Sequence, residues 1–322
     1  MSLTRHDWKR FAIGLCEVGL LLTLLFSVVT VFGQLHRNFD LFSHFRFQYF
    51  VASVLLTLVF VILRWRGYIW LGVLAVGVNA YFVVPWFLPV DEALTNNNAT
   101  ATPIRLLHAN VLHTNDNANL FLALVRDEQP DLIVLQEATP KWISMLYPIE
   151  PSYPYTLIEA RGDQFGIALY SKFPLDSTAI IESVPLGFPD LIATAIVGGK
   201  RLNIISTHPI PPIGVGRYSA RNLQLDSAAK LAARTPNPVI VVGDLNVTMW
   251  GHHYGRLEEI SGLRNARRGF GIKPTWPLFF LPALIPIDHC LVSDGVQVVD
   301  FRTGPQIGSD HLPIIVSLLI SK

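Results

Sequence analysis

The feature that most restricts the folds open to this chain is an apolar run near its start that is long enough to cross a lipid bilayer. Phe11–Phe32 is 22 residues long and carries one charge, at Glu17. About 20 consecutive apolar residues suffice for a transmembrane helix, whereas a cleaved signal peptide has a shorter apolar region followed by small residues. The run is therefore interpreted as the first helix of a permanent membrane anchor.

Two further apolar runs complete the predicted anchor, which occupies residues 1–90. The three spans are expected at about 11–33, 47–63 and 68–89, and a polar linker at 91–103 follows them. The second run is short for a span, so the number of crossings depends on it. Asn79, within the third span, is expected to make a hydrogen bond between helices.

The basic residues around these spans predict their orientation, because cytoplasmic loops carry an excess of lysine and arginine. Five basic residues lie before the first span or between the second and third, against two between the first and second: Arg5, Lys9, Arg10, Arg64 and Arg66 against Arg37 and Arg46. The amino terminus is therefore predicted to be cytoplasmic. Three crossings of the cell (inner or plasma) membrane then place the chain after residue 90 outside the cytoplasm. If the second run does not cross, the orientation reverses.

Residues 104–322 have the composition of an ordinary globular domain. Charged residues make up 15% of the whole chain, below the usual ~25%, and the deficit lies in residues 11–90. The net charge of +1 gives no general argument for nucleic acid, which normally selects a basic excess. Cys16 and Cys290 lie in different parts of the chain, so the fold is not expected to depend on a disulfide.

Strands and helices of this domain are bounded by clear signals. Asn115 or Asp116 is predicted to cap a helix that runs to about Gln129, and Gly198-Gly199 is predicted to turn a hairpin. Val239–Val242 is typical of a strand buried on both faces, and Gly243-Asp244-Leu245-Asn246 follows it. By itself, an Asp-x-Asn after a strand is more often a helix cap or an Asx turn than a pair of catalytic residues.

Other strands carry polar residues at their ends in the same way. One group follows strands and the other precedes them: Asn110, Glu137, His208, Asp244 and Asn246, then Asp288, Asp310 and His311. If the second group of strands runs antiparallel to the first, all eight side chains meet at one edge of two packed sheets. Two carboxylates, Glu137 and Asp310, together with Asn110 suit a hard cation such as Mg²⁺. The histidines would act on a phosphate oxygen or on water instead.

These motifs resemble the endonuclease/exonuclease/phosphatase superfamily, over about residues 104–320. The resemblance is carried by Ala109-Asn110-Val111, Leu135-Gln136-Glu137, Ser206-Thr207-His208, Gly243-Asp244-Leu245-Asn246, Ile287-Asp288-His289 and Gly308-Ser309-Asp310-His311. It implies a DNase I-like, four-layer α/β/β/α sandwich over residues 104–322. It also implies metal-dependent hydrolysis of a phosphate ester or anhydride bond, with Mg²⁺ as the expected ion and Mn²⁺ as the alternative.

The resemblance also implies a role for each residue. Glu137 matches the principal metal ligand, with Asn110 and Asp310 assisting, and the number of metal ions stays open. Asp244 and Asn246 match the pair that positions water and the scissile phosphate, and His208 matches a histidine that stabilises phosphoryl charge. His311 matches the catalytic histidine and Asp288 the carboxylate that orients it. Either His311 or Asp244 is a plausible general base. Arg217 and Arg221 are read equally well as phosphate ligands or as solvated helix residues.

The motifs do not choose the substrate, but two other features favour a lipid. The domain is tethered to a membrane anchor, and residues 275–286 form a very apolar loop that leads directly to Asp288. Such a loop suits a membrane interface, although it could instead pack on the protein itself. Residues 185–189 form a second apolar lip. We therefore expect a hydrolase of a lipid phosphodiester or pyrophosphate whose partner is the bilayer.

Two alternatives stay open. A tethered nuclease would use the same chemistry on DNA or RNA, and a non-catalytic member of the superfamily would only bind. The sequence identifies neither the headgroup nor the oligomeric state, and it points to no protein partner.

Overall fold

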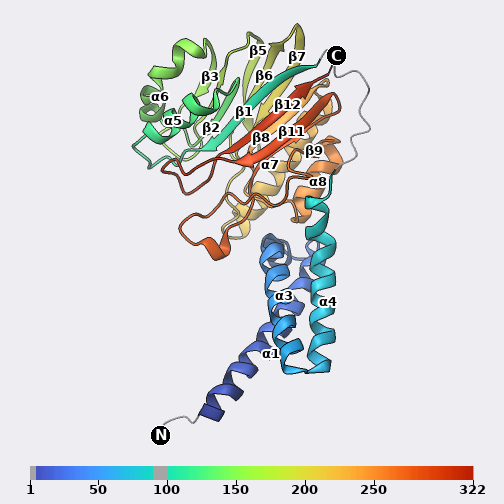
Figure 1. The fold of residues 1–322 in the computed structure, drawn as a ribbon. Helices are drawn as coiled ribbons and strands as arrows, with labels where there is room; N and C mark the ends of the chain where they lie inside the picture. The colour runs from blue at the N-terminus through green and yellow to red at the C-terminus, as the bar shows by residue number, and fades with distance from the viewer. Residues whose placement is uncertain (1–4, 90–100, 322) are drawn as a thin grey trace. The chain divides into compact units, whose positions relative to one another are not determined.

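The computed structural model describes residues 5–89 and 101–321 (Figure 1). Its contacts divide the chain into two compact units. The first comprises Met1–Phe87 with Trp250–His252, and the second comprises Leu88–Met249 with His253–Lys322. The predicted linker at 91–103 falls largely outside the described residues.

The first unit is helical. Its elements are α1 (Arg5–Val29), η1 (Thr30–Phe32), α2 (Arg37–Phe42), η2 (Ser43–Phe45), α3 (Arg46–Leu63), α4 (Arg66–Val83) and η3 (Val84–Phe87). Three helical segments are long and apolar enough to cross a membrane: Asp7–Phe32, Arg37–Leu63 and Arg66–Phe87. The second is 27 residues long, so the expectation that it is short for a span was wrong.

Buried polar contacts within the bundle explain this longer second span. Helical backbone begins at Arg37, ten residues before the purely apolar run, and polar side chains of this stretch turn inward. Nη1 of Arg46 donates a 2.8 Å hydrogen bond to the carbonyl oxygen of Ser27. Nδ2 of Asn79 donates to Oγ of Ser27 at 2.7 Å, which confirms the expected hydrogen bond between helices.

The second unit contains two six-stranded sheets. The first sheet has the order β11-β12-β1-β2-β4-β3 and the second β5-β6-β7-β8-β10-β9. The strands of the first sheet are β1 (Thr102–Asn110), β2 (Leu132–Gln136), β3 (Tyr155–Glu159), β4 (Ile167–Ser171), β11 (Val296–Thr303) and β12 (Ile314–Ile320). Those of the second are β5 (Leu175–Ser183), β6 (Phe188–Val197), β7 (Lys200–Ser206), β8 (Val239–Asp244), β9 (Arg264–Asn265) and β10 (Asp288–Val292). The hairpin at Gly198-Gly199 joins β6 to β7, as predicted.

Alternation along the strands builds the layers. On β1, Leu106 belongs to a core shared by both sheets, whereas Leu107 packs with helical residues such as Phe121 and Trp142 on the outer face. The helices of the unit are α5 (Asn119–Glu128), α6 (Pro140–Met145), η5 (Tyr147–Ser152), α7 (Val215–Arg234), α8 (His252–Ser261) and η6 (Leu281–Ala283). The result is the expected four-layer α/β/β/α sandwich.

The helix α5 begins later than predicted. Neither Asn115 nor Asp116 caps it, because its first residue is Asn119. Oδ1 of Asn115 accepts a hydrogen bond from N of Asn117, and Oδ1 of Asn117 accepts one from N of Asn119. Two successive Asx turns therefore occupy the residues that the prediction gave to the first helical turn.

Strand direction brings the predicted site residues to one edge. β10 pairs antiparallel with β8, and Asp288 lies opposite Asp244. β12 pairs antiparallel with β1, while β2 runs parallel to β1. The strands that begin with polar residues thus start where the others end, which is the condition that the sequence argument required.

Candidate active site

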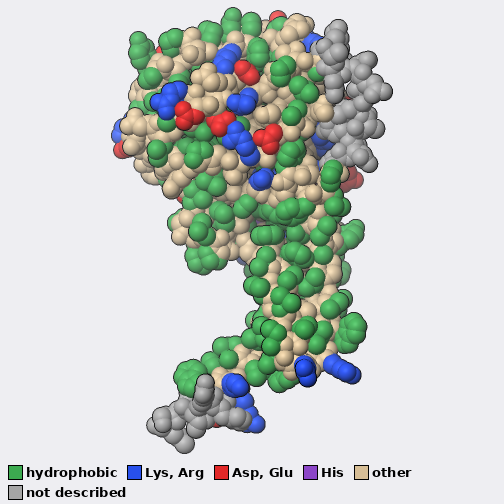
Figure 2. All heavy atoms as spheres, in the orientation of Figure 1, with side chains coloured by type: hydrophobic (Ala, Val, Ile, Leu, Met, Phe, Trp, Pro, Cys, Tyr) green, Lys and Arg blue, Asp and Glu red, His purple; other side chains and the backbone are tan. Residues whose placement is uncertain are grey.

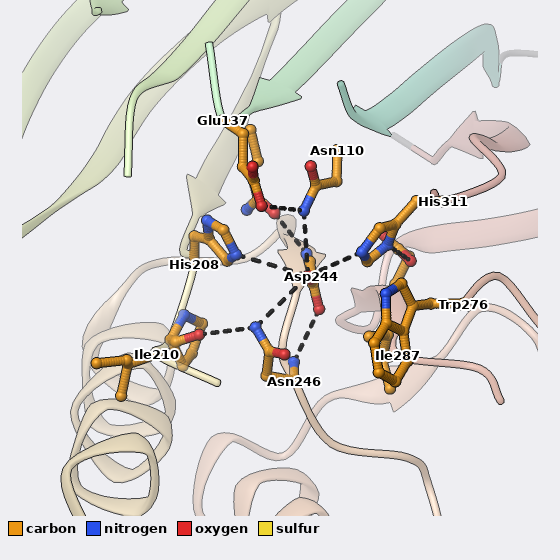
Figure 3. A network of polar contacts seen from close by, with 12 residues as sticks. Asn110, Glu137, His208, Ile210, Asp244, Asn246, Trp276, Ile287 and His311 are labelled. Carbon is orange, nitrogen blue, oxygen red and sulfur yellow. Dashed lines mark hydrogen bonds and ion pairs between the residues drawn. The ribbon is translucent and has the colours of Figure 1, made fainter. Parts of the chain in front are cut away.

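Asp244 lies at the centre of a buried polar cluster formed by strand ends of both sheets (Figure 3). Its Oδ2 lies 3.3 Å from Nδ2 of Asn110, 3.5 Å from Nε2 of His208 and 3.7 Å from Nε2 of His311. All four residues are buried. With Nδ2 of Asn246 at 3.5 Å, this carboxylate oxygen is shared by two amides and two imidazoles.

The backbone around Asp244 is fixed by a contact between the sheets. Oε1 of Gln136, at the end of β2, accepts a 2.7 Å hydrogen bond from the backbone N of Asp244, and Nε2 donates to the carbonyl oxygen of Thr207 at 2.7 Å. A Cβ at position 243 would collide with that same carbonyl and with the Gln136 side chain, so glycine is required there. Gln136 thus joins the first sheet to the end of β7 and β8.

Asn246 completes this turn. Its backbone N donates to Oδ1 of Asp244 at 2.9 Å, and its Nδ2 donates to the carbonyl oxygen of Pro209 at 3.0 Å. The first contact is an Asx turn, the alternative interpretation of the motif. Asp244 takes part in the Asx turn and in the polar cluster at the same time, because it uses Oδ1 for the turn and Oδ2 for the cluster.

Glu137 is held with its carboxylate toward the cluster. Its backbone φ is 60°, a left-handed value that costs a non-glycine residue roughly 1 kcal/mol. Three hydrogen bonds offset this cost: Oε1 accepts from Nδ2 of Asn110 at 3.1 Å, and Oε2 accepts from the backbone N of His113 at 2.9 Å and lies 2.7 Å from its Nδ1. Burial raises the pKa of Glu137, but the nearby His208 and the hydrogen bonds outweigh burial and lower it. The carboxylate is therefore the favoured form.

Asp288 lies between two imidazoles. Its Oδ2 is 2.9 Å from Nδ1 of His311 and its Oδ1 is 3.0 Å from Nε2 of His108. Burial alone would raise the pKa of Asp288, yet the charge of His311 and the two hydrogen bonds hold it well below its usual range. A charged Asp288 fixes the orientation of the His311 ring and directs Nε2 toward Asp244.

His208 faces the same space from the end of β7. Burial lowers its pKa, but the hydrogen bond and charge of Asp244, with the charge of Glu137, raise it overall. Its ring lies 5.6 Å from that of Phe165, which stacks on Phe188 at 3.5 Å between ring centroids. His208 thus lies near two carboxylates that favour its protonated form, with the ring of Phe165 on one side.

The structure brings seven of the eight predicted residues together, and Asp310 makes a different contact. Its Oδ2 accepts a 2.9 Å hydrogen bond from Nε1 of Trp276. The cluster holds Asn110, Glu137, His208, Asp244, Asn246, Asp288 and His311. Metal ligation by Asp310 stays a prediction.

Sequence reasoning missed several residues that support the cluster. His108 precedes Asn110 by two positions on β1, and this spacing places both side chains on one face of the strand, which could have indicated it. His113 and Gln136 gave no such signal. His113 contacts Glu137 and Gln136 contacts Asp244, and both contacts join segments that are distant in the sequence. Arg221 is not a solvated helix residue: it is fully buried, and its Nη1 donates to the carbonyl oxygen of Asn246 at 2.8 Å.

Glu137 is the residue best suited to hold a metal ion. Among residues 5–89 and 101–321, no group of three or more His, Cys, Asp or Glu side chains has metal-binding geometry. A divalent cation such as Mg²⁺ is commonly held by one or two carboxylates together with water and substrate phosphates, and Glu137 offers one such carboxylate. Asn110 directs Nδ2 at Glu137 while its Oδ1 accepts from the backbone N of Leu112. Its oxygen would reach a metal beside Glu137 only after rotation of the amide.

The chain resembles proteins of one family. A model of the endonuclease/exonuclease/phosphatase family matches residues 107–311. A comparison of the sequence with curated proteins gave no significant match.

Solved structures share the fold. A humanised TDP2 from D. rerio is 18% identical, with a TM-score of 0.59 over 67% of this chain and 98% of that one. An endonuclease/exonuclease/phosphatase from Bacteroides vulgatus is 17% identical, with a TM-score of 0.55 over 68% and 100%. One from Beutenbergia cavernae is 17% identical, with a TM-score of 0.55 over 68% and 72%. Identities this low show the fold alone.

Proposed function

The chain belongs to the endonuclease/exonuclease/phosphatase family, and on this premise we propose that it cleaves a lipid phosphodiester or pyrophosphate at a membrane surface. The family makes it a metal-dependent hydrolase of phosphate ester or anhydride bonds. The lipid substrate, Mg²⁺ as the ion and the extracytoplasmic location are our proposals.

The observation that carries the lipid proposal is the contact between an exposed apolar loop and the segment that carries His311 of the catalytic cluster. Trp276, at the start of the loop, donates to Asp310, the residue before His311. The same loop exposes Phe279, Phe280 and Leu281. A lipid substrate would meet apolar side chains directly beside the reacting groups. The three candidate spans keep the catalytic unit close to a bilayer.

The chain's own residues supply three parts of the reaction. Asp244 and Asn246 would position water and the scissile phosphate, since their side chains lie next to each other among the imidazoles of His208 and His311. His208, whose pKa is raised, would stabilise negative charge on the phosphoryl oxygens. Asp244 and His311 lie 3.7 Å apart, so either could accept the proton from water.

Glu137 would hold the metal, with Asn110 and Asp310 as assisting ligands. When bound, a divalent cation neutralises charge on the phosphate in the transition state. Glu137 suits this role because its lowered pKa keeps it ionised without the metal.

The basic residues favour a cytoplasmic amino terminus and an extracytoplasmic catalytic unit. A second span of 27 residues supports three crossings, on which this orientation depends. Protease added outside intact cells should then cut within residues 91–103. Protection of this segment until the cells are lysed would reverse the assignment.

Turnover by the full-length protein in liposomes tests the substrate. We expect Mg²⁺-dependent hydrolysis of a lipid phosphodiester or a polyprenyl pyrophosphate, and loss of at least 100-fold in Glu137→Gln. Glu150→Gln, at an exposed glutamate, is the matched control and should retain activity. Cleavage of DNA that Glu137→Gln abolishes, with no lipid turnover, would refute the lipid proposal. Full activity of Glu137→Gln would refute the assignment of the site.

A tethered nuclease is the second candidate. One solved relative in fold is a D. rerio TDP2 complexed with a single-strand DNA product, 17% identical with a TM-score of 0.58 over 67% of this chain and 98% of that one. Against this candidate, Arg221 is buried on Asn246 and is not presented to a nucleic acid backbone. The DNA arm of the same assay decides between the two.

A further inference from the structure

Three exposed apolar tips surround the catalytic cluster. The first lies at 277–284, the second at 184–189 and the third at 209–216, and none of the three contains a charged residue. Phe279, Phe280 and Leu281 of the first tip are 76%, 56% and 66% exposed. The other two tips expose the following side chains: Val184, Leu186, Ile213 and Val215.

Strand pairing places all three tips at the edge of the sandwich that holds the site. The first tip leads to Asp288, which lies opposite Asp244. The second precedes β6, whose Leu191 pairs with Ser206 at the end of β7, just before His208. The third follows His208 along the chain. Gln224 joins the last two tips, because its Oε1 accepts from N of Ile210 and its Nε2 donates to Oγ of Ser183, both at 2.9 Å.

The first tip has a fixed base. Trp276 and Ile285 form an isolated β-bridge that closes its neck. On the catalytic side, N of Leu278 donates to the carbonyl oxygen of Asp310 at 3.0 Å, and N of Leu312 donates to that of Thr275 at 2.9 Å. The segment on both sides of His311 is therefore hydrogen-bonded to the base of the tip. Figure 1 shows the loop with η6 (orange) projecting from the catalytic unit, and Figure 2 shows hydrophobic side chains gathered on it.

We propose that these three tips form a membrane-docking rim that inserts into the interface of the bilayer and sets the catalytic cluster against lipid headgroups. Aromatic and leucine side chains without neighbouring charge are favoured at this interface. Because the first tip is bonded to the segment that carries His311, its depth of insertion fixes the height of the catalytic groups above the acyl region.

We take the bilayer as the partner of the docking rim because the same chain carries the predicted membrane anchor. Three segments long enough to span a membrane precede the catalytic unit, and residues 88–101 join the two. An extended linker of this length reaches at most about 50 Å, so the catalytic unit stays near the membrane surface. The inference rests on the proposed function in one respect, the location of the catalytic unit at a membrane.

Depth-dependent fluorescence quenching tests the docking without any substrate. An environment-sensitive label is attached to Phe280→Cys in a full-length Cys16→Ser background, in which the remaining Cys290 is buried. Liposomes of anionic and neutral phospholipid carry a doxyl quencher on the acyl chain. We expect quenching at position 280, and also at Leu186→Cys of the second tip. Asp294→Cys, an exposed turn at the opposite ends of β10 and β11, is the matched control and should not be quenched.

Equal quenching at 280 and 294, or none at either 280 or 186, would overturn the docking rim. A second measurement compares turnover of lipid in bilayers with turnover of a water-soluble phosphodiester. The ratio of lipid turnover to soluble turnover should fall at least tenfold in the triple variant Phe279→Ser/Phe280→Ser/Leu281→Ser. An unchanged ratio would contradict the docking rim.

The two readouts separate this inference from the proposed function. Quenching at 280 without lipid hydrolysis would refute the lipid substrate and leave the docking rim intact. Lipid hydrolysis without quenching would refute the docking rim and leave the lipid substrate intact.

Discussion

Gln136 should be a critical structural residue of the catalytic unit, although it contacts no substrate. Its side chain is buried and joins the two sheets, with 2.7 Å hydrogen bonds to the backbone N of Asp244 and to the carbonyl oxygen of Thr207. Methionine has nearly the same volume and no hydrogen-bonding amide. Gln136→Met therefore removes both bonds while leaving the packing almost unchanged.

The expected loss follows from the two backbone groups that are left behind. Each buried group without a partner costs about 1–3 kcal/mol, so the variant should lose about 2–6 kcal/mol of unfolding free energy. In a unit of this size, about 1 kcal/mol lowers the melting temperature by roughly 2–4 °C, which gives a decrease of roughly 4–24 °C. Activity should also fall about tenfold, because Asp244 loses the contact that fixes its backbone.

Thermal unfolding of the full-length protein in detergent, followed by tryptophan fluorescence, measures this effect. Gln306→Met is the matched control, because Gln306 is exposed, and its melting temperature should change by less than about 2 °C. A Gln136→Met variant that melts with the wild type and keeps full activity would refute the role of the bridge between the sheets.

Three further predictions concern the site and its support. Arg221→Met should reduce the free energy of unfolding by about 2–4 kcal/mol and lower kcat, because the carbonyl of Asn246 loses a buried charged donor. Arg217→Met, at an exposed position, should change neither quantity. Thermal melting and kinetics of both variants check this. Burial raises the pKa of Asp190 from 3.8 to about 7, although a hydrogen bond from Thr207 and the charge of His208 oppose the shift. Because this pKa is higher in the folded state, ionisation of Asp190 makes the protein less stable as the pH rises from about 4 to about 7. Asp190→Asn should remove that slope and add up to about 4 kcal/mol at pH 8; melting temperatures that keep the wild-type pH dependence would contradict this. Chelation by EDTA should abolish hydrolysis, and Mg²⁺ should restore it in the wild type but not in Glu137→Gln; activity that persists in EDTA would exclude the metal requirement.

The site could be predicted where polar residues sit at fixed positions on strongly patterned strands. Val239–Val242 predicts a buried strand from local sequence alone, so Asp244 is placed at its end without tertiary information. Asn110, Asp288 and His311 follow from the same argument. The supporting residues could not be found in this way. His113 contacts Glu137 from a segment 24 residues away in the sequence, and Gln136 reaches Asp244 only because the two sheets pack together.

The length of the second span and the burial of Arg221 were missed for the same physical reason. The second span looked short because its first part is polar, yet Arg46 is buried on the backbone of Ser27, within the helical bundle. Arg221 was left open between a phosphate ligand and a solvated helix residue, because helix periodicity does not reveal which charged residue a neighbouring loop will cover. In both cases a tertiary hydrogen bond stabilises a charge that local sequence assigns to water.

The sequence by itself predicted three apolar spans, a catalytic unit of this family and the residues expected to react, because these predictions depend on apolar length, strand pattern and short motifs. Tertiary structure alone decided that one oxygen of Asp244 contacts Asn110, His208 and His311 and that Asp288 lies between two histidines. It also decided that Asp310 contacts Trp276 at the base of an exposed apolar tip. Distances between strand ends arise from sheet packing, and no local pattern of residues encodes them.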